Sequence, residues 1–196
     1  MTGNTRVPPT EITGLYGAVL KKFSERMFGG VPESLGVMWH SKPVLKASLG
    51  LGRKAAKWNA CDKDLKSYAH MAVASLIGCS FCLDLGYFQA HNEGLDLDKA
   101  REVPRWRESE AFTLLERDVL EYAEAMTQTP PTVTDELAAR LLDRLGAPAR
   151  VELTTWISMA NQFARGNVAL GIEAEGFAAS CGLEPLSQPS GVASRA

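Results

Sequence analysis

The chain has 196 residues, of which 45% are apolar and 22% are charged, and its formal net charge is -2. This length and composition allow one domain, or two closely packed helical halves, to bury a hydrophobic core. Lysines and arginines are scattered without a basic stripe, which argues against a nucleic-acid partner. No apolar run is long enough to cross a bilayer and no signal-type apolar core follows the N-terminus, so we expect no membrane association and a cytoplasmic location.

Helix signals run from Ile12 to about Gly171, and no stretch alternates as a half-buried strand does. Apolar residues recur with helical spacing from Ile12 to Met27. Asp62 suits the N-cap of a later helix, which Gly78 interrupts. A capping-box pattern, Thr113-Leu114-Leu115-Glu116, begins another helix. The expected helices cover about 12–27, 32–38, 43–57, 63–77, 79–93, 113–127, 134–145 and 149–171, with a short turn from Asp96 or Asp98 to Pro104.

These elements predict an all-α fold. We expect one helical domain over 10–184. The segments 1–9 and 185–196 are expected to be flexible, because they lack helical periodicity and contain too few apolar residues to order themselves.

The sequence Cys79-Ser80-Phe81-Cys82 is the strongest chemical signal in the chain. Two thiols at this spacing can exchange a disulfide and two electrons, whereas Cys61 and Cys181 have no close sequence partner. The position after Gly78 suggests a helix N-terminus, whose partial positive charge lowers a thiol pKa from about 8.5 towards 7. A thiolate there can attack a peroxide O–O bond to give a sulfenic acid, which the second thiol converts to a disulfide and water. This chemistry needs the two sulfurs within bonding reach and open to solvent.

A base or proton donor has to come from outside the cysteine pair. His70 lies on the preceding helix, three residues after Ser67, and can overhang the thiols if the chain bends at the glycine between the helices. The alternative is that His70 is an ordinary hydrogen-bonded histidine in the core or at its rim, and the sequence favours neither interpretation. His91 is expected on the opposite side of its helix, and His40 suits a cap or a surface position.

Metal and haem sites are poorly supported. A structural zinc site needs four ligands, usually in two close pairs, and the remaining Cys and His residues are not paired in sequence. Covalent haem attachment needs a histidine where the chain has Leu83. We therefore predict neither a metal nor a cofactor. For the cysteines themselves, the alternative to redox chemistry is two small buried side chains near a helix start.

Three blocks of the sequence together suggest a family. They are Gly78-Cys79-Ser80-Phe81-Cys82-Leu83-Asp84-Leu85-Gly86, Glu116-Arg117-Asp118-Val119-Leu120-Glu121-Tyr122-Ala123 and Asn161-Gln162-Phe163-Ala164-Arg165-Gly166-Asn167. Over about 31–177 the chain resembles the carboxymuconolactone decarboxylase and alkylhydroperoxidase D superfamily. The resemblance implies an alkylhydroperoxidase D-like helical bundle, assembly as a dimer, trimer, hexamer or larger ring, and thiol-dependent peroxidase activity where both cysteines are present. It also implies that Cys82 is the peroxidatic residue and that Cys79 is its proton donor and resolving thiol.

The chain departs from the peroxidase members of that superfamily in the proton relay. Those members have a Glu twelve residues before the first cysteine and a His four residues after the second, where this chain has Ser67 and Gly86. Neither residue can act as a base at neutral pH. Either His70 has taken over, with a water bridging through Ser67, or the peroxidase rate is poor.

Four further polar residues of these blocks are candidates for a role near the site: Asp84, Asn161, Arg165 and Asn167. Asp84 is expected to face away from the cysteines and to stabilise the first turn of its helix or to be solvated. Asn161 and Arg165 share a helix face, and with Asn167 we interpret them as a polar packing network, with anion or substrate binding as the lesser alternative.

Three functions are consistent with the sequence. The first is a thiol-dependent peroxidase or disulfide oxidoreductase, acting on a hydroperoxide or a disulfide partner protein and recycled by a thiol reductant. The second is a carboxymuconolactone decarboxylase-type lyase or isomerase, which needs an acid and a base but no thiols. The third is a non-catalytic helical oligomer with a vestigial or redox-sensing cysteine pair. Apolar surplus on the helices, including four tryptophans, is consistent with a homo-oligomer.

Overall fold

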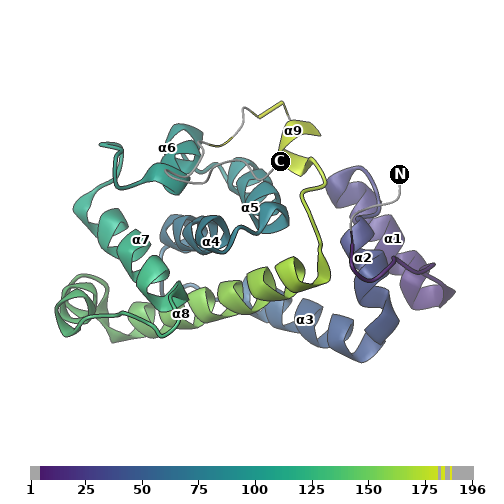
Figure 1. The fold of residues 1–196 in the computed structure, drawn as a ribbon, viewed down its shortest axis with the longest axis horizontal. Helices are drawn as coiled ribbons and strands as arrows, with labels where there is room; N and C mark the ends of the chain where they lie inside the picture. Colours follow the sequence, from purple (N-terminus) through teal and green to yellow (C-terminus); the bar gives the residue numbers. More distant parts are fainter. Residues whose placement is uncertain (1–4, 181, 184–185, 187–196) are drawn as a thin grey trace.

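The computed structural model describes residues 5–180, 182–183 and 186, and within these ranges the protein is all-helical, as predicted (Figure 1). Two parts can be distinguished in the ribbon. The body consists of α4 (Lys63–Ile77), α5 (Ser80–Asn92), α6 (Leu97–Glu102), α7 (Leu114–Thr127) and α8 (Asp135–Leu170). The arm consists of α1 (Gly14–Phe28), α2 (Glu33–Met38) and α3 (Lys42–Ala55) and lies to one side of the body. A single turn, α9 (Phe177–Ser180), follows α8, and 3-10 turns at Trp39–Ser41 and Val103–Arg105 link neighbouring helices.

The helix ends form where the sequence predicts them, because the capping side chains satisfy backbone N–H groups that have no partner inside the helix. The Asp62 carboxylate accepts from the N–H groups of Asp64 and Leu65 at the start of α4. Thr113 and Glu116 form the predicted capping box at the start of α7. The predicted break in the last part of the chain is also present. Gly146 has φ 76° and ψ 164°, so α8 is two helical segments joined end to end.

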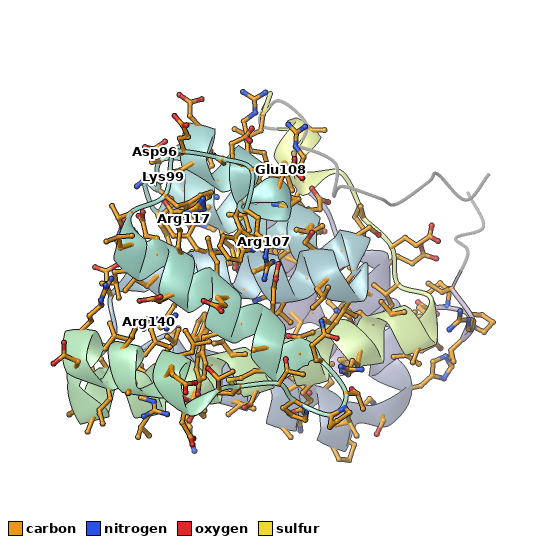
Figure 2. All side chains as sticks on the ribbon, turned by 60° about the vertical axis from the view of Figure 1, so that its left-hand side comes forward. Asp96, Lys99, Arg107, Glu108, Arg117 and Arg140 are labelled. Atoms are coloured by element: carbon orange, nitrogen blue, oxygen red, sulfur yellow. A yellow bond between two sulfur atoms is a disulfide. The ribbon has the colours of Figure 1, made fainter. Side chains whose placement is uncertain are left out.

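The hydrophobic core surrounds α4, which packs against α5, α7 and α8 (Figure 1). Most residues of α4 are buried, because other helices cover it on several sides. Polar side chains join α7 and α8 at the rim of this core: Asp118 is buried and pairs with Arg140 at 3.1 Å and with Arg144 at 3.4 Å. Figure 2 shows Lys99, Arg117 and Arg140 among the charged side chains around α7. The largest fully buried side chains are Met71, Leu120, Leu137, Leu141, Leu153 and Ile157.

The arm has a small core of its own, formed by Ile12, Trp39 and Leu45. The apolar spacing correctly predicts α1 as a helix, but it does not place the apolar side chains inside the protein. Leu15 is 86% exposed, and Val19 and Phe23 are each 58% exposed. In the single chain, α1 therefore presents an apolar face to solvent.

The segments predicted to be flexible are only partly covered by the structure. Near the N-terminus, the Arg6 guanidinium donates to the carbonyl oxygens of Val168 and Ala169, and the Arg6 N–H donates to that of Leu170. These three bonds cap the C-terminal end of α8. Apart from residue 186, the predicted C-terminal tail lies outside the described residues, and the domain bounds 10–184 stay a prediction. No helix within the described ranges is long and apolar enough to span a membrane.

Candidate redox site

The cysteine pair lies at a corner between α4 and α5, and the local sequence explains that corner. Gly78 ends α4 with φ 77° and ψ 30°, a left-handed conformation that favours glycine because a Cβ is strained there. The N–H of Cys79 donates back to the carbonyl of Ala74 at 2.9 Å. Cys79 is then the N-cap of α5, and its Sγ accepts from the N–H of Cys82 at 3.3 Å. The pair therefore lies at a helix N-terminus, as predicted.

The two sulfurs are bonded to each other as a disulfide, and the Cα atoms of Cys79 and Cys82 are 5.3 Å apart. The requirement for bonding reach is therefore met. The second requirement is not met in the single chain, because Cys79 is 0% exposed and Cys82 is 3% exposed. A peroxide or an attacking thiol reaches these sulfurs only when the side chains around them move.

His70 reaches the backbone of Cys82 but not its sulfur. Its Nε2 lies 3.3 Å from the carbonyl oxygen of Cys82. A carbonyl can only accept, so in the neutral ring Nε2 carries the hydrogen and the lone pair is on Nδ1. Burial lowers the pKa of His70 below its ordinary value of 6.5, and the hydrogen bond to Cys82 partly offsets this. The ring is therefore neutral at pH 7, and the nitrogen that faces the Cys82 carbonyl is a donor rather than a base.

Ser67 and Gly86, at the two positions of the expected relay, each have a structural contact. Ser67 Oγ donates to the carbonyl of Lys63 on its own helix at 3.0 Å. Gly86 is buried, and a Cβ at that position would lie 3.0 Å from Cδ2 of His70. The His70 ring thus packs directly against the backbone where peroxidase relatives are expected to have a histidine. Glycine at 86 makes room for it.

Asn167 is the polar residue that the sequence interpretation misplaced. Its Nδ2 lies 3.4 Å from Cys82 Sγ, so it belongs to the redox site rather than to a packing network. Asn161 and Arg165 do form the predicted network at the end of α7: Asn161 donates to Thr127 Oγ1, and Arg165 donates to the Thr127 carbonyl. Helical spacing predicts that Asn167 lies on a different face of α8 from Asn161 and Arg165. It does not predict which residue Asn167 contacts.

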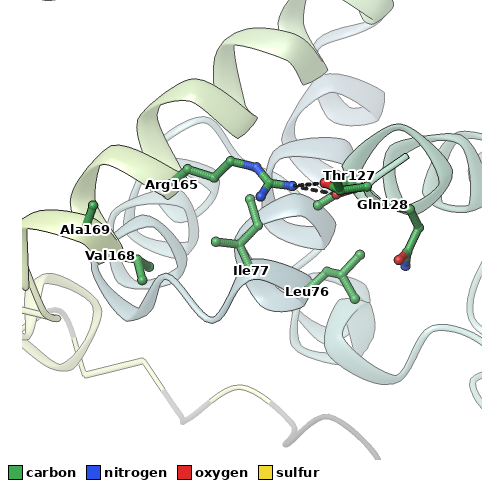
Figure 3. A pocket seen from close by; sticks show the side chains of 8 residues that line it. Leu76, Ile77, Thr127, Gln128, Arg165, Val168 and Ala169 are labelled. Atoms are coloured by element: carbon green, nitrogen blue, oxygen red, sulfur yellow. Dashed lines mark hydrogen bonds between the residues drawn. The ribbon is translucent and has the colours of Figure 1, made fainter. Parts of the chain in front are cut away.

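A groove of about 570 Å³ is lined by Ile77, two residues before Cys79 in the chain, and by Val168, which follows Asn167 (Figure 3). The C-terminal ends of α4 and α7 and the last turns of α8 form it, and its one charged lining residue is Arg165. Both helix C-termini carry partial negative charge, which the guanidinium offsets by capping α7. This arrangement disfavours the anion-binding interpretation of Arg165.

Asp84 has a larger role than the sequence suggested. Its carboxylate accepts from four backbone N–H groups, those of residues 175, 176, 177 and 178, at 2.7 to 3.1 Å. Ser80 Oγ accepts from the N–H of Ala174. Together, two residues of the cysteine block hold the segment 174–178 against α5. Phe177 of that segment packs on Phe28, Phe81 and Phe88.

The remaining candidates lie away from the pair. His40 Nε2 is 2.9 Å from the Pro8 carbonyl, and His91 is exposed near the end of α5. Cys61 is buried and is not disulfide-bonded, and burial raises the pKa of its thiol to about 11. Cys181 lies outside the described residues.

Sequence comparison identifies the family. The profile of the Carboxymuconolactone decarboxylase family matches residues 43–125. The chain is 37% identical over 130 residues to the uncharacterized protein YnjA of Escherichia coli (strain K12), which covers 66% of this chain and 71% of that protein. The chain belongs to the carboxymuconolactone decarboxylase family. This family member is also 25% identical over 119 residues to the uncharacterized protein YdfG of Bacillus subtilis (strain 168), covering 60% of this chain and 81% of that protein.

Solved structures share the fold of this family member. A protein of unknown function from Agrobacterium tumefaciens, named as a candidate antioxidant defence protein AhpD, has a TM-score of 0.66 and 21% identity, covering 70% of this chain and 94% of its own. The debrominase Bmp8 has a TM-score of 0.75 and 20% identity, covering 90% and 96%. A Bmp8 variant with one cysteine replaced by alanine, in complex with 2,3,4-tribromopyrrole, has a TM-score of 0.76 and 19% identity, covering 92% and 97%. At these identities the likeness establishes the alkylhydroperoxidase D-like fold and nothing further.

Proposed function

We propose that this protein is a thiol-dependent oxidoreductase that reduces a hydroperoxide with the Cys79 and Cys82 pair. The observation that carries the proposal is the bond between the two sulfurs at the N-terminus of α5. That geometry gives one thiol a neighbour within bonding reach. It also gives the thiolate form the favourable field of the helix N-terminus.

The reaction needs two steps. The Cys82 thiolate attacks one oxygen of the hydroperoxide, forming an S–O bond while the O–O bond breaks, and the leaving alkoxide takes a proton to become the alcohol. Cys79 sulfur then attacks the Cys82 sulfenic acid, forming the disulfide and releasing water. Two thiols of a low-potential reductant then return the pair to two thiols: the first forms a mixed disulfide with one cysteine, and the second displaces that cysteine, so the reductant leaves as a disulfide. In this scheme Cys79 is the first proton donor, because His70 does not reach the sulfur.

A thiol count before and after stoichiometric hydrogen peroxide tests the proposal. The parent protein is expected to lose two fast-reacting thiols and to gain the Cys79–Cys82 disulfide. Cys79→Ser is expected to trap a sulfenic acid, which a dimedone adduct detects by mass spectrometry, and Cys82→Ser is expected to trap none. The exposed Ser41→Cys variant is the control for non-specific oxidation. A parent whose pair reacts no faster than the introduced thiol of that control contradicts the proposal.

Reductive debromination is the second candidate, and the Bmp8 fold over nine-tenths of the chain is the reason to test it. The same two thiols suffice chemically. A Cys82 thiolate attacks the bromine, the C–Br bond breaks and the carbon takes a proton, and Cys79 then displaces bromide to form the disulfide. Incubating the reduced protein with 2,3,4-tribromopyrrole and measuring released bromide tests this. One bromide per pair, absent in Cys82→Ser, supports it, and no bromide rejects it.

The lyase alternative is less well supported. Proton transfer next to a lactone requires an acid and a base facing one pocket. Each of the two grooves described on this protein has Arg165 as its one charged lining residue. No carboxylate or histidine lines either groove, so neither supplies that pair of groups.

We also propose that the protein is a homo-oligomer, held by the apolar face of α1. Two of the tryptophans on which the sequence argument relied, Trp39 and Trp106, are buried within the chain and are not available to a partner. The exposed side chains of Leu15, Val19 and Phe23 form the proposed subunit interface instead. A continuous apolar helix face is stabilised when a second surface covers it. Val19→Glu with Phe23→Glu is expected to reduce the mass measured by light scattering to that of one chain. The matched variant Lys22→Glu with Glu25→Lys, on the same helix, is expected to keep the parent mass.

A further inference from the structure

Asn167 lies outside the cysteine pair, and its side chain donates a hydrogen bond to the Cys82 sulfur. Two side chains were expected to act on Cys82, namely Cys79 and His70, the latter with a water bridging through Ser67. Cys79 is its disulfide partner, His70 reaches only its carbonyl, and Ser67 bonds to its own helix. Asn167, from the far end of α8, is the residue whose donor nitrogen meets Cys82 Sγ, at 3.4 Å.

We propose that Asn167 is a catalytic residue of the pair, whose amide N–H stabilises the Cys82 sulfur as a thiolate when the disulfide is reduced. This rests on the proposed function in one respect, namely that Cys82 is the sulfur that ionises. An N–H donor binds an anionic sulfur more strongly than a thiol or a disulfide sulfur, so it favours the charged form. Cys82 is almost fully buried, and in such surroundings a hydrogen bond to a charge is stronger than in water.

The amide also does what the missing relay cannot do. A Glu and His relay changes its charge with pH, whereas an amide donor has no proton to gain or lose near neutrality. Asn167 therefore sets the ionisation of Cys82 without delivering a proton. Proton delivery to the leaving oxygen remains with Cys79.

The backbone around Asn167 is held from two sides. Its carbonyl oxygen accepts from Ile172 N–H at 2.9 Å in the turn that ends α8. The Arg6 guanidinium caps the next two carbonyls, at 2.9 and 2.8 Å. A donor on a fixed backbone loses little conformational freedom when the sulfur ionises, which is what a preorganised site requires.

The test is the pKa of the Cys82 thiol, measured in the Cys79→Ser protein from the ultraviolet absorbance of the thiolate as a function of pH. The absorbance of the Cys79→Ser, Cys82→Ser protein is subtracted as the blank. Absorbance needs no reagent to reach the buried sulfur. Asn167→Leu removes the donor and is expected to raise the measured pKa of Cys82 by about 1. Asn167→Asp, close in shape to the parent, replaces the donor with a negative charge and is expected to raise it further.

Asn161→Leu is the matched control, because Asn161 is on the same helix and its amide bonds to Thr127 and Ile157 instead of sulfur. It is expected to leave the pKa of Cys82 unchanged. An unchanged pKa in both Asn167 variants, or an equal rise in Asn161→Leu, overturns the proposal.

The reduction potential of the Cys79–Cys82 disulfide gives a second measurement. If Asn167→Leu makes the reduced, thiolate state tenfold less favourable, the potential becomes more negative by about 30 mV. Equilibration with glutathione measures it, and an unchanged potential also counts against Asn167. None of these readouts uses peroxide. If peroxide does not oxidise the pair, the proposed peroxidase function fails while the role of Asn167 is judged separately.

Discussion

The body and the arm of this protein use similar amphipathic helices to opposite effect. In the body, apolar side chains such as Leu153 and Met71 are fully buried around α4. In the arm, α1 has equally regular apolar spacing, yet Leu15, Val19 and Phe23 face solvent in the single chain. The difference teaches that helical periodicity predicts that a face will be covered, but not by what. In the body the cover is the chain itself, and in the arm we propose a second copy.

The largest expected effect sharpens this contrast directly. Leu153→Ala removes a fully buried side chain and is expected to lower the free energy of unfolding by about 2–5 kcal/mol, because it loses burial and leaves a cavity. Leu15→Ala, at a side chain that is 86% exposed, is expected to change it by less than about 0.5 kcal/mol in the dissociated chain. Urea unfolding at a protein concentration where light scattering finds single chains measures both. Equal losses would mean that α1 is packed within its own chain.

The next effect concerns the segment 174–178, which lies between α5 and the arm. Asp84→Ala removes the acceptor of four backbone N–H groups and is expected to destabilise the protein by about 1–3 kcal/mol, since these donors lose a charged partner. Amide hydrogen exchange at 175–178 is expected to become faster. Asp98→Ala is the control, because its side chain is 99% exposed and it lies in the first turn of α6. Unchanged exchange at 175–178 would show that Asp84 does not hold this segment.

The third prediction uses the lowered pKa of His70. Between that pKa and the ordinary value of 6.5, the unfolded chain binds more protons than the folded one, so stability is fully present above pH 6.5 and falls as the pH drops below it. One such group contributes at most about 1.4 kcal/mol per pH unit. His70→Gln is expected to flatten this part of the stability curve measured by urea unfolding. His91→Gln, at an exposed position, is expected to retain the parent curve, and a retained curve in His70→Gln would contradict the prediction.

The smallest effect is the fit between His70 and Gly86. Gly86→Ala gains helix propensity of up to about 1 kcal/mol, but its Cβ would crowd the ring at 3.0 Å. In the parent the two effects are expected to offset each other roughly. In a His70→Ala background, Gly86→Ala is expected to be clearly stabilising, with a coupling between the two sites of about 0.5–1 kcal/mol in a thermal-unfolding cycle. Additive effects would mean that the ring already has room to move.

His70→Ala also separates the two interpretations of the relay. The structure places its donor nitrogen on a carbonyl, so we expect the variant to react with peroxide at nearly the parent rate across neutral pH. Stopped-flow kinetics of the Cys79–Cys82 pair measure this. A large loss of rate, with folding intact, would restore His70 as the substitute base.

Much of the fold could be predicted because helix ends are local. Asp62, Thr113 and Gly78 act on backbone groups within a few residues, so the sequence placed the bounds of α4, α5 and α7 closely and located the cysteine pair at a helix N-terminus. The family resemblance rested on the same short blocks. The relay departure at 67 and 86 could likewise be seen from spacing alone.

Local patterns along the chain were therefore enough to predict the helices, the fold class and the pair of sulfurs that carries the proposed chemistry. The tertiary structure decided what surrounds that pair. It buried both sulfurs, moved His70 to a carbonyl, and brought Asn167 to Cys82 from 85 residues away. The physical reason is range: caps and helical periodicity act within one or two turns, whereas the polar partner of a buried sulfur depends on how α5 and α8 pack, which spacing along the chain does not encode.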